Sequence, residues 1–241
     1  MRKFGLIGYP LSHSFSKKYF SDIFSKEGID AEYNNYPIEN ISMVRSLLED
    51  PLLEGINVTI PYKEAVISYL DELSEAVKEI GACNCIRIRD GRTKGFNTDV
   101  LGFDRSLSKK LRPVNDKALV LGTGGAAKAV CYVLRQRNIP FWQVSRKPKE
   151  GIISYADVTH AMIEEHRLLI NTTPLGMYPN TNECPALPYE AITPDHYLYD
   201  LVYNPEKTLF LQKGEERGAV IENGHDMLII QANESRKIWN I

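Results

Sequence analysis

The feature that most limits the folds open to this chain is a glycine-rich block, GTGGAA at residues 122–127, between a predicted strand and a predicted helix. Residues 117–122 form a short apolar run, residues 125–136 carry a helical apolar stripe, and residues 141–145 form the next strand. A strand, a crossover helix and a second strand make a βαβ unit, which requires a parallel sheet. Glycines at the strand-to-helix turn also let a phosphate approach the backbone amides of the helix. The block therefore predicts a dinucleotide-binding unit.

Predicted strands and helices alternate along the rest of the chain as well, which is typical of α/β folds with mainly parallel sheets. Before the glycine block, strands are expected at 3–8, 31–38, 55–60, 83–89 and 92–97, and helices at 16–26, 42–50, within 63–80 and from 100 towards 113. After the βαβ unit, strands are expected at 168–171, 197–202 and 219–222, and helices at 206–217 and 225–239. Asp90-Gly91, between two strands, predicts a two-residue hairpin turn.

Composition limits the possible partners of the chain. Its 241 residues allow two small domains or one large one, and 43% hydrophobic and 25% charged residues are ordinary for a soluble globular protein. A formal net charge of −2 gives no electrostatic reason for nucleic-acid binding. No apolar run approaches the roughly 18 residues of a membrane span, and the apolar stretch at the N-terminus is too short for a signal peptide. We expect a cytoplasmic protein, a monomer or homodimer, with no nucleic-acid or membrane partner.

The four cysteines, at positions 83, 85, 131 and 184, form no disulfide framework for a chain of this length. Cys83 and Cys85 are spaced as half of a metal site, but no second Cys or His pair stands at ligand spacing. On one strand, side-chain alternation would place both thiols on the same face. We expect two reduced structural thiols and no bound metal.

Two short blocks each place an ionisable side chain just beyond a predicted strand, where α/β proteins build their sites. They are NVTIPYK at 57–63, which ends in Lys63, and GFNTD at 95–99, which ends in Asp99. A lysine in such a site can supply a cation or a proton to a reacting group. Taken alone, Lys63 fits a solvated lysine and Asp99 fits a helix cap. Combined with a nucleotide loop, they favour redox chemistry on a small polar molecule.

The strand after the glycine block ends in Ser145 and Arg146, where an NAD site usually offers a carboxylate to the ribose 2′-hydroxyl. A carboxylate would repel a 2′-phosphate, whereas a guanidinium binds it through two hydrogen bonds. Arg146 therefore predicts NADP as the cofactor. The alternative is an ordinary exposed arginine after a strand.

Three polar residues near predicted helices are candidates for substrate contacts. Ser14 and Ser16 stand where the first helix begins, so each can cap it, and two hydroxyls beside free helix N–H groups also suit a carboxylate. Gln231 follows Met227 by four positions and Leu228 by three, so it lies on the apolar stripe of the last helix. An amide on that stripe needs a polar partner.

Eight blocks occur in this chain in the order found in shikimate dehydrogenases, and they extend from residue 8 to residue 231. They are GYPLSHSFS (8–16), NVTIPYK (57–63), GACN (81–84), GFNTD (95–99), GTGGAA (122–127), NTTPLGM (171–177), DLVYNP (200–205) and GHDMLIIQ (224–231). On these residues the chain closely resembles the shikimate dehydrogenase family. The resemblance implies reversible NADPH-dependent reduction of 3-dehydroshikimate to shikimate, in chorismate and aromatic amino-acid biosynthesis. The family often has Thr in place of Cys85 and an apolar residue in place of His225, and neither difference removes a group that the chemistry requires.

Carried over position by position, the resemblance assigns a role to each candidate residue. Ser14 and Ser16 would hold the substrate carboxylate, and Tyr203 would lie near substrate and nicotinamide. Lys63 would sit at the reacting oxygen with Asp99 beside it, and either can be the formal acid/base. The other implied substrate contacts are Thr59, Asn84 and Gln231. The implied cofactor contacts are Gly122, Gly124, Gly125, Ala126, Ser145, Arg146, Thr172, Met177, Val202 and Gly224.

The implied architecture has two domains. Residues 1–100 would form an α/β substrate domain with a mainly parallel sheet, completed by the returning helix 224–241, and residues 101–223 a Rossmann-like NADP domain. Three other functions stay open: a quinate/shikimate dehydrogenase with relaxed substrate or cofactor choice, a methylene-tetrahydrofolate dehydrogenase-like enzyme, and a non-catalytic sensor of NADP and shikimate. The paired serines and Gln231 disfavour the second, and intact Lys63 and Asp99 disfavour the third.

Overall fold

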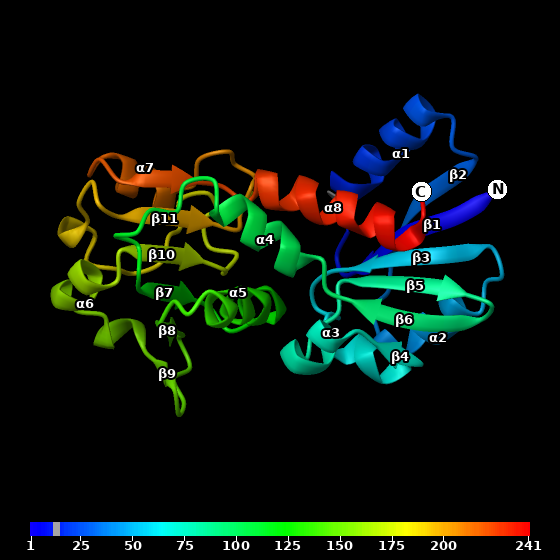
Figure 1. Ribbon diagram of the computed structural model, residues 1–241, viewed down its shortest axis with the longest axis horizontal. Coiled ribbons are helices and arrows are strands. Elements are labelled where there is room, and N and C mark those ends of the chain that lie inside the picture. Colours follow the sequence, from blue (N-terminus) through cyan, green and yellow to red (C-terminus); the bar gives the residue numbers. More distant parts are fainter. Residues whose placement is uncertain (12–14) are drawn as a thin grey trace. The chain divides into compact units, whose positions relative to one another are not determined.

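The computed structural model describes residues 1–11 and 15–241, which divide into two compact units (Figure 1). The first unit comprises Met1–Thr98 and Gln231–Ile241, and the second comprises Asp99–Ile230. Each unit is built on its own six-stranded sheet, with helices on both faces. The assignment of the first unit to substrate and of the second to the cofactor stays a prediction. No helix in the described ranges has the length and apolar character of a membrane span.

The sheet of the first unit is mixed, with the strand order β2-β1-β3-β5-β6-β4. Its strands are β1 (Arg2–Gly8), β2 (Ala31–Pro37), β3 (Leu53–Val58), β4 (Glu72–Leu73), β5 (Cys85–Arg89) and β6 (Arg92–Phe96). The pairs β1–β2, β1–β3 and β4–β6 are parallel, and β3–β5 and β5–β6 are antiparallel. Asp90 and Gly91 both have positive φ, 51° and 72°, so the predicted hairpin turn is confirmed.

Helices cover both faces of this sheet. They are α1 (Phe15–Glu27), α2 (Val44–Leu48), α3 (Glu75–Ile80) and the last part of α8 (His225–Trp239), with short 3₁₀ helices at Ile41–Met43 and Ala65–Tyr69. On one face, Phe20 of α1 and Trp239 of α8 pack with Phe4 of β1. The Trp239 ring reaches the sheet because Gly55 has no side chain: a Cβ there would lie 2.3 Å from Trp239 Nε1. That nitrogen donates a 2.8 Å hydrogen bond to the Ile86 carbonyl.

The sheet of the second unit is entirely parallel, with the order β12-β11-β10-β7-β8-β9. Its strands are β7 (Ala118–Leu121), β8 (Phe141–Val144), β9 (Ile152–Ile153), β10 (Leu168–Asn171), β11 (Tyr197–Asp200) and β12 (Val220–Glu222). Numbered within the unit, this order is 6-5-4-1-2-3, the doubly wound arrangement of dinucleotide-binding folds. The order reverses between β7 and β10, which is the point where such sheets bind ligands.

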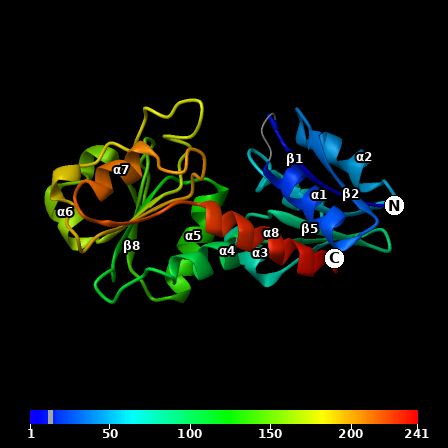
Figure 2. The ribbon, with the colours of Figure 1, turned by 90° about the horizontal axis from the view of Figure 1, so that it is seen from above.

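Side-chain alternation buries both faces of this second sheet. On one face, Val120 of β7 and Ile170 of β10 pack against α4 (Asp99–Leu107) and α5 (Gly125–Gln136). On the other face, Leu121 and Leu169 pack against α6 (His160–Glu165) and α7 (Leu209–Glu215), and Figure 2 shows these helices from above. A further 3₁₀ turn at Tyr155–Asp157 and one at Tyr189–Ala191 complete the unit.

Sequence patterns predicted the long elements and missed short ones. The segment expected to be helical, 63–80, contains a 3₁₀ helix, the two-residue strand β4 and then α3. Strand β9 and helix α6 were not predicted, because two-residue strands and six-residue helices are too short for periodicity to identify. Thr159 marks the start of α6, since its side chain accepts a hydrogen bond from the Met162 amide.

The expectation that Cys83 and Cys85 lie on the same face was wrong. Strand β5 begins only at Cys85, so Cys83 precedes the region where alternation applies. Cys83 packs among Ile56 and Ile86, whereas Cys85 packs with Phe4 on the opposite side of the sheet. Burial raises the pKa of Cys85 well above the usual range, so this thiol stays protonated.

Candidate functional site

Strand register brings several predicted substrate residues of the first unit to one edge of its sheet. Strands β1 and β3 are parallel and end at this edge. Strand β5 is antiparallel to β3 and pairs Cys85 with Asn57, so it begins there, and β6 pairs Phe96 with Cys85 and ends there. Residues that follow or precede these strand ends are Thr59, Lys63, Asn84, Asn97 and Thr98.

A buried hydrogen-bonded group joins two of these loops to the last helix. The Asn84 side chain accepts from the Thr98 amide at 2.7 Å and donates to the Thr98 hydroxyl at 3.0 Å. The Thr98 hydroxyl is also 3.3 Å from Oε1 of Gln231 on α8. Asn84 and Gln231 were predicted to bind one ligand, and the structure brings them together around Thr98. Sequence reasoning missed Thr98, although it directly precedes Asp99 in the GFNTD block.

The segment that carries Thr59 and Lys63 is held by its backbone. The Thr59 amide donates to the Ile7 carbonyl at 2.9 Å, and the Cys83 amide donates to the Lys63 carbonyl at 2.7 Å. Gly8 leaves room for this segment, since a Cβ there would lie 2.4 Å from Thr59 Cγ2. The Lys63 side chain is half-buried. The backbone that carries it is fixed by hydrogen bonds at Thr59 and at Lys63 itself.

Ser16 leads into a second buried network. It lies in the first turn of α1 and hydrogen-bonds Tyr33, where burial raises the pKa of the phenol and this bond opposes the rise. The Tyr33 hydroxyl donates to Asn57 Oδ1 at 2.9 Å. Asn57 Nδ2 donates to Ser235 Oγ at 2.9 Å and to the Asn84 carbonyl at 3.3 Å. Polar contacts therefore run from Ser16, which is predicted to bind the substrate carboxylate, to the loop of Asn84.

We expect Asn57→Leu to lower the free energy of unfolding by about 2–3 kcal/mol, because it leaves buried polar groups of Tyr33 and Ser235 without their partner. Urea denaturation monitored by circular dichroism measures this change. Asn180→Leu, the same substitution at an exposed position, is the matched control and should shift stability by less than about 0.5 kcal/mol. Equal stability of the two variants would contradict the role given to Asn57.

The remaining predicted substrate and catalytic residues lie elsewhere. Ser14 lies outside the described residues. Asp99 is the first residue of α4 in the second unit and is 6% exposed. Tyr203 follows β11 in the same unit and is half-buried, and burial raises the pKa of its phenol.

The glycine loop of the second unit has the shape that its sequence predicts. Gly122 has φ +116°, and a Cβ there would lie 2.4 Å from Thr172 Oγ1. Gly124 is the N-cap of α5, and a Cβ on it would have no atom within 4 Å in the described structure. The first-turn amides of a helix have no partner within the helix. Space beside Gly124 and these amides, together with Gly125 and Ala126, fit a pyrophosphate group.

Ser145 and Arg146 follow β8, the strand next to β7. The Ser145 hydroxyl accepts from the Lys147 amide at 3.2 Å, which fixes the turn after the strand. The Arg146 side chain is exposed, and its charge lies near Tyr155, a phenol whose pKa is raised by burial and lowered by this guanidinium. An exposed guanidinium just after β8, the second strand of the parallel sheet along the chain, suits a ribose 2′-phosphate.

The other proposed cofactor residues lie on loops at the carboxyl ends of β10, β11 and β12. Thr172 directly follows β10, and its hydroxyl donates to the Leu121 carbonyl at 2.6 Å, beside the glycine loop. Met177 is 46% exposed at the end of the same loop. Gly224 follows β12, and its amide donates to the Val202 carbonyl at 3.1 Å. These contacts bring the glycine loop and the three following loops to one edge of the sheet.

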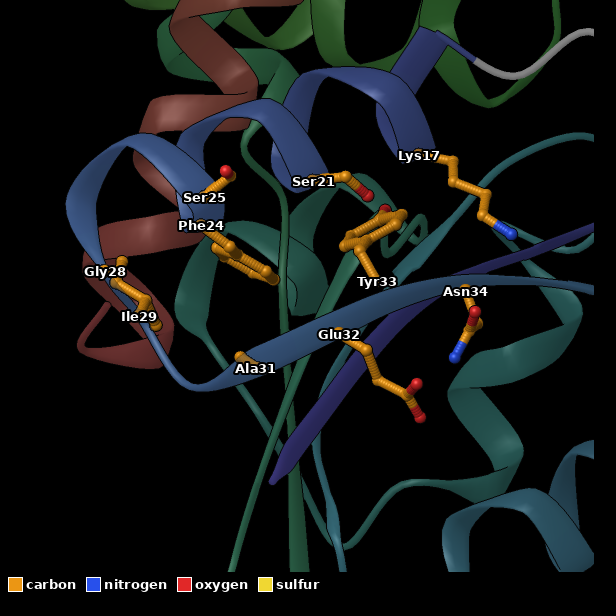
Figure 3. Close-up of a pocket in the computed structure, with 10 residues that line it drawn as sticks. All are labelled: Lys17, Ser21, Phe24, Ser25, Gly28, Ile29, Ala31, Glu32, Tyr33 and Asn34. Carbon is orange, nitrogen blue, oxygen red and sulfur yellow. The ribbon is translucent and has the colours of Figure 1, made fainter.

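Within the described residues, no group of three or more His, Cys, Asp or Glu side chains is arranged to hold a metal ion. A shallow groove of about 460 Å³ lies between α1 and β2 (Figure 3). It is lined by residues such as Lys17, Ser21 and Glu32, and by none of the residues predicted for the site.

The doubly wound sheet with its glycine loop in the second unit, and the convergent polar side chains in the first unit, define a class, the two-unit α/β dehydrogenases. Residues 6–86 match the family model described as the shikimate dehydrogenase substrate binding domain. A curated relative from Methanococcus maripaludis, named shikimate dehydrogenase (NADP(+)), is 38% identical over 98% of this chain and 90% of its own length. The chain belongs to the shikimate dehydrogenase family.

Solved structures of the family have the same fold. The Thermus thermophilus enzyme in complex with NADP(H) and shikimate is 30% identical, with a TM-score of 0.88 over 99% of this chain and 93% of that one. The Listeria monocytogenes enzyme in complex with shikimate and NAD is 27% identical, with a TM-score of 0.85 over 100% of this chain and 92% of that one. The predicted α/β fold is therefore confirmed, and its first sheet, expected to be mainly parallel, is mixed because β5 runs antiparallel to both of its neighbours.

Proposed function

We propose that this chain is an NADP-dependent shikimate dehydrogenase, which reversibly reduces 3-dehydroshikimate to shikimate in the pathway to chorismate. Family membership over nearly the full length supports this activity. The observation that carries it is the convergence of Asn84, Thr98 and Gln231 at one edge of the first sheet. A cyclic polyol requires such a cluster, because each of its hydroxyls both donates and accepts hydrogen bonds.

We propose the first unit as the substrate domain. Ser16, in the first turn of α1, would bind the substrate carboxylate together with Ser14, since anions are favoured at helix N-termini. Thr59, Asn84 and Gln231 would contact the hydroxyls and the ring edge. The hydrogen bonds to Thr98 hold the side chains of Asn84 and Gln231 before substrate arrives, which lowers the entropy cost of binding.

We propose the second unit as the NADP domain. Gly122, Gly124, Gly125 and Ala126 would face the pyrophosphate, with Ser145 and Arg146 at the 2′-phosphate. Thr172, Met177, Val202 and Gly224 would line the redox end. The bound cofactor supplies the hydride, and the residues of this chain position the reactants and handle the proton.

Lys63 and Asp99 are the proposed catalytic residues. As hydride reaches the ketone, negative charge develops on its oxygen, and the Lys63 ammonium would stabilise that charge or donate a proton to it. Asp99 would orient the ammonium and a substrate hydroxyl, with Tyr203 near substrate and nicotinamide. In the oxidative direction the same pair would accept the hydroxyl proton. We expect the enzyme to work in the cytoplasm on small molecules, as a monomer or homodimer.

An absorbance assay at 340 nm tests the proposed function. Purified protein with shikimate and NADP should form NADPH, and protein without shikimate should not. Repeating the assay with quinate and with NAD measures substrate and cofactor choice. The NAD arm has a specific reason, because the Listeria monocytogenes structure was determined with shikimate and NAD. Binding of NADP and shikimate without turnover would instead support a sensor.

The paired serines provide a prediction about the substrate half. Ser14→Ala with Ser16→Ala should raise the KM for shikimate by at least about tenfold, because charge-assisted hydrogen bonds of about 1.5–3 kcal/mol each are lost. The KM for NADP should change much less. Steady-state kinetics with each reactant varied in turn measures both. If the KM for NADP rises instead, the carboxylate has been placed in the wrong half of the molecule.

A further inference from the structure

Asp200 is a buried carboxylate at the carboxyl end of β11, in the second unit, with no role in the mechanism above. Its side chain is 0% exposed, and three neutral groups donate hydrogen bonds to it. Asn171 Nδ2 and the Val202 amide each donate to Oδ1 at 3.0 Å, and the Thr208 hydroxyl donates to Oδ2 at 2.6 Å. Asn171 and Thr208 are themselves fully buried.

A carboxylate buried in this position lowers the stability of the folded protein unless it is well hydrogen-bonded. Burial raises the pKa of Asp200 to about 7, and the hydrogen bonds from Thr208, Val202 and Asn171 act in the opposite direction. A buried charge costs stability unless several hydrogen bonds satisfy it, and an apolar residue would avoid that cost. What this carboxylate offers in return is the ability to accept several hydrogen bonds at once, from groups on different loops.

Asp200 stabilises the loop after β10 through its hydrogen bond to Asn171. Through Nδ2, Asn171 is bound to Asp200, and through Oδ1 it accepts from the Thr173 amide at 3.0 Å and the Thr173 hydroxyl at 2.7 Å. Thr172 lies between Asn171 and Thr173 in the sequence, and its hydroxyl donates to the Leu121 carbonyl next to the glycine loop. The Asn171 side chain thus fixes the backbone on both sides of a proposed cofactor residue.

Asp200 also stabilises the loop after β11. Its bond to the Val202 amide turns the chain directly after the strand, and the Val202 carbonyl then accepts from Gly224. Gly224 lies so close that a Cβ would be 2.1 Å from the Leu201 carbonyl oxygen. Thr208, at the N-cap of α7, anchors the far end of this loop to the same carboxylate.

We propose that Asp200, together with Asn171 and Thr208, is a positioning residue for the nicotinamide and pyrophosphate end of NADP. Its carboxylate holds the loops of Thr172, Met177, Val202 and Gly224 in register with the glycine loop, without itself touching the cofactor. The inference rests on the proposed function. It adds that the two ends of the cofactor site are separately supported, because Arg146 lies after β8, outside this group of contacts.

Binding of two ligands to the whole protein tests this separation. Isothermal calorimetry would measure Kd for NADP+ and for adenosine 2′,5′-bisphosphate, which lacks the nicotinamide half and the pyrophosphate link. Asp200→Ala should raise the Kd for NADP+ by at least about tenfold, since displaced binding groups lose much of their effect. It should change the Kd for the bisphosphate by less than about threefold.

Conservative variants separate positioning from charge. In Asp200→Asn, Oδ1 can still accept from Asn171 and Val202, while the amide nitrogen donates to the Thr208 hydroxyl, which can also accept. Its Kd for NADP+ should stay within about threefold of the unmodified protein. Thr208→Ser should likewise preserve binding, whereas Thr208→Val should weaken NADP+ but not the bisphosphate. If Asp200→Ala does not fold, this Thr208 pair decides the matter.

Three results would overturn the inference. One is a folded Asp200→Ala or Thr208→Val protein that binds NADP+ normally, and another is equal weakening of NADP+ and bisphosphate, which indicates general loosening of the unit. The third is an Asp200→Asn protein as weak as Asp200→Ala. An unmodified protein that binds neither ligand would instead refute the proposed function, and this inference with it.

Discussion

Lys63→Ala should lower kcat for shikimate oxidation by roughly 10²–10⁴-fold, the range typical of a lost acid or base. Charge on the reacting oxygen would then have no matching cation. KM should change modestly, because substrate keeps its contacts to Ser16, Asn84 and Gln231. A fall in kcat at nearly constant KM marks an interaction made mainly in the transition state. Steady-state kinetics in both directions measures the two parameters.

Lys78→Ala is the control for this variant, because Lys78 is exposed on α3 in the same unit and should leave kcat unchanged. Circular dichroism should show both variants folded, since a half-buried lysine adds little to the core. A folded Lys63→Ala enzyme with near-normal kcat would refute the role of Lys63. Asp99 would then be the leading candidate for the acid/base.

Arg146→Asp should lower the preference for NADP over NAD by roughly 10²-fold or more. It removes a charge-assisted contact of about 1.5–3 kcal/mol to the 2′-phosphate and adds repulsion, and about 1.4 kcal/mol corresponds to tenfold in affinity. Titration of both cofactors into each protein measures the ratio. Arg89→Asp, at an exposed position in the first unit, is the control. An unchanged NADP/NAD ratio in Arg146→Asp would show that Arg146 does not contact the 2′-phosphate.

Local sequence patterns were sufficient for much of this fold. Helices α5 and α8 and strand β10 begin and end at the predicted residues, because capping glycines, apolar stripes and short buried runs act within the segment itself. The glycine block also predicted its loop correctly, since positive φ at Gly122 and close approach to Thr172 both require glycine.

Contacts between segments that are far apart in the sequence could not be predicted from local patterns. Nothing in the neighbourhood of Tyr33 indicates that its hydroxyl meets Asn57, or that Asn57 meets Ser235 near the other end of the chain. The DLVYNP block does not indicate a role for Asp200, because the burial of this carboxylate and its hydrogen bond to Thr208 depend on the tertiary fold. The predicted roles of Lys63 and Asp99 stay predictions, since they depend on a bound substrate.

Helix α8 has a consequence for how the protein is made. Within α8, the residues up to Ile230 belong to the second unit. Gln231–Ile241 belong to the first unit, whose other residues, Met1–Thr98, come at the beginning of the chain. Trp239 fills a space above Gly55 and is 2% exposed, so the first sheet lacks a large part of one face until this residue has been translated. The residues translated first therefore complete their core only after nearly the whole second unit has been made.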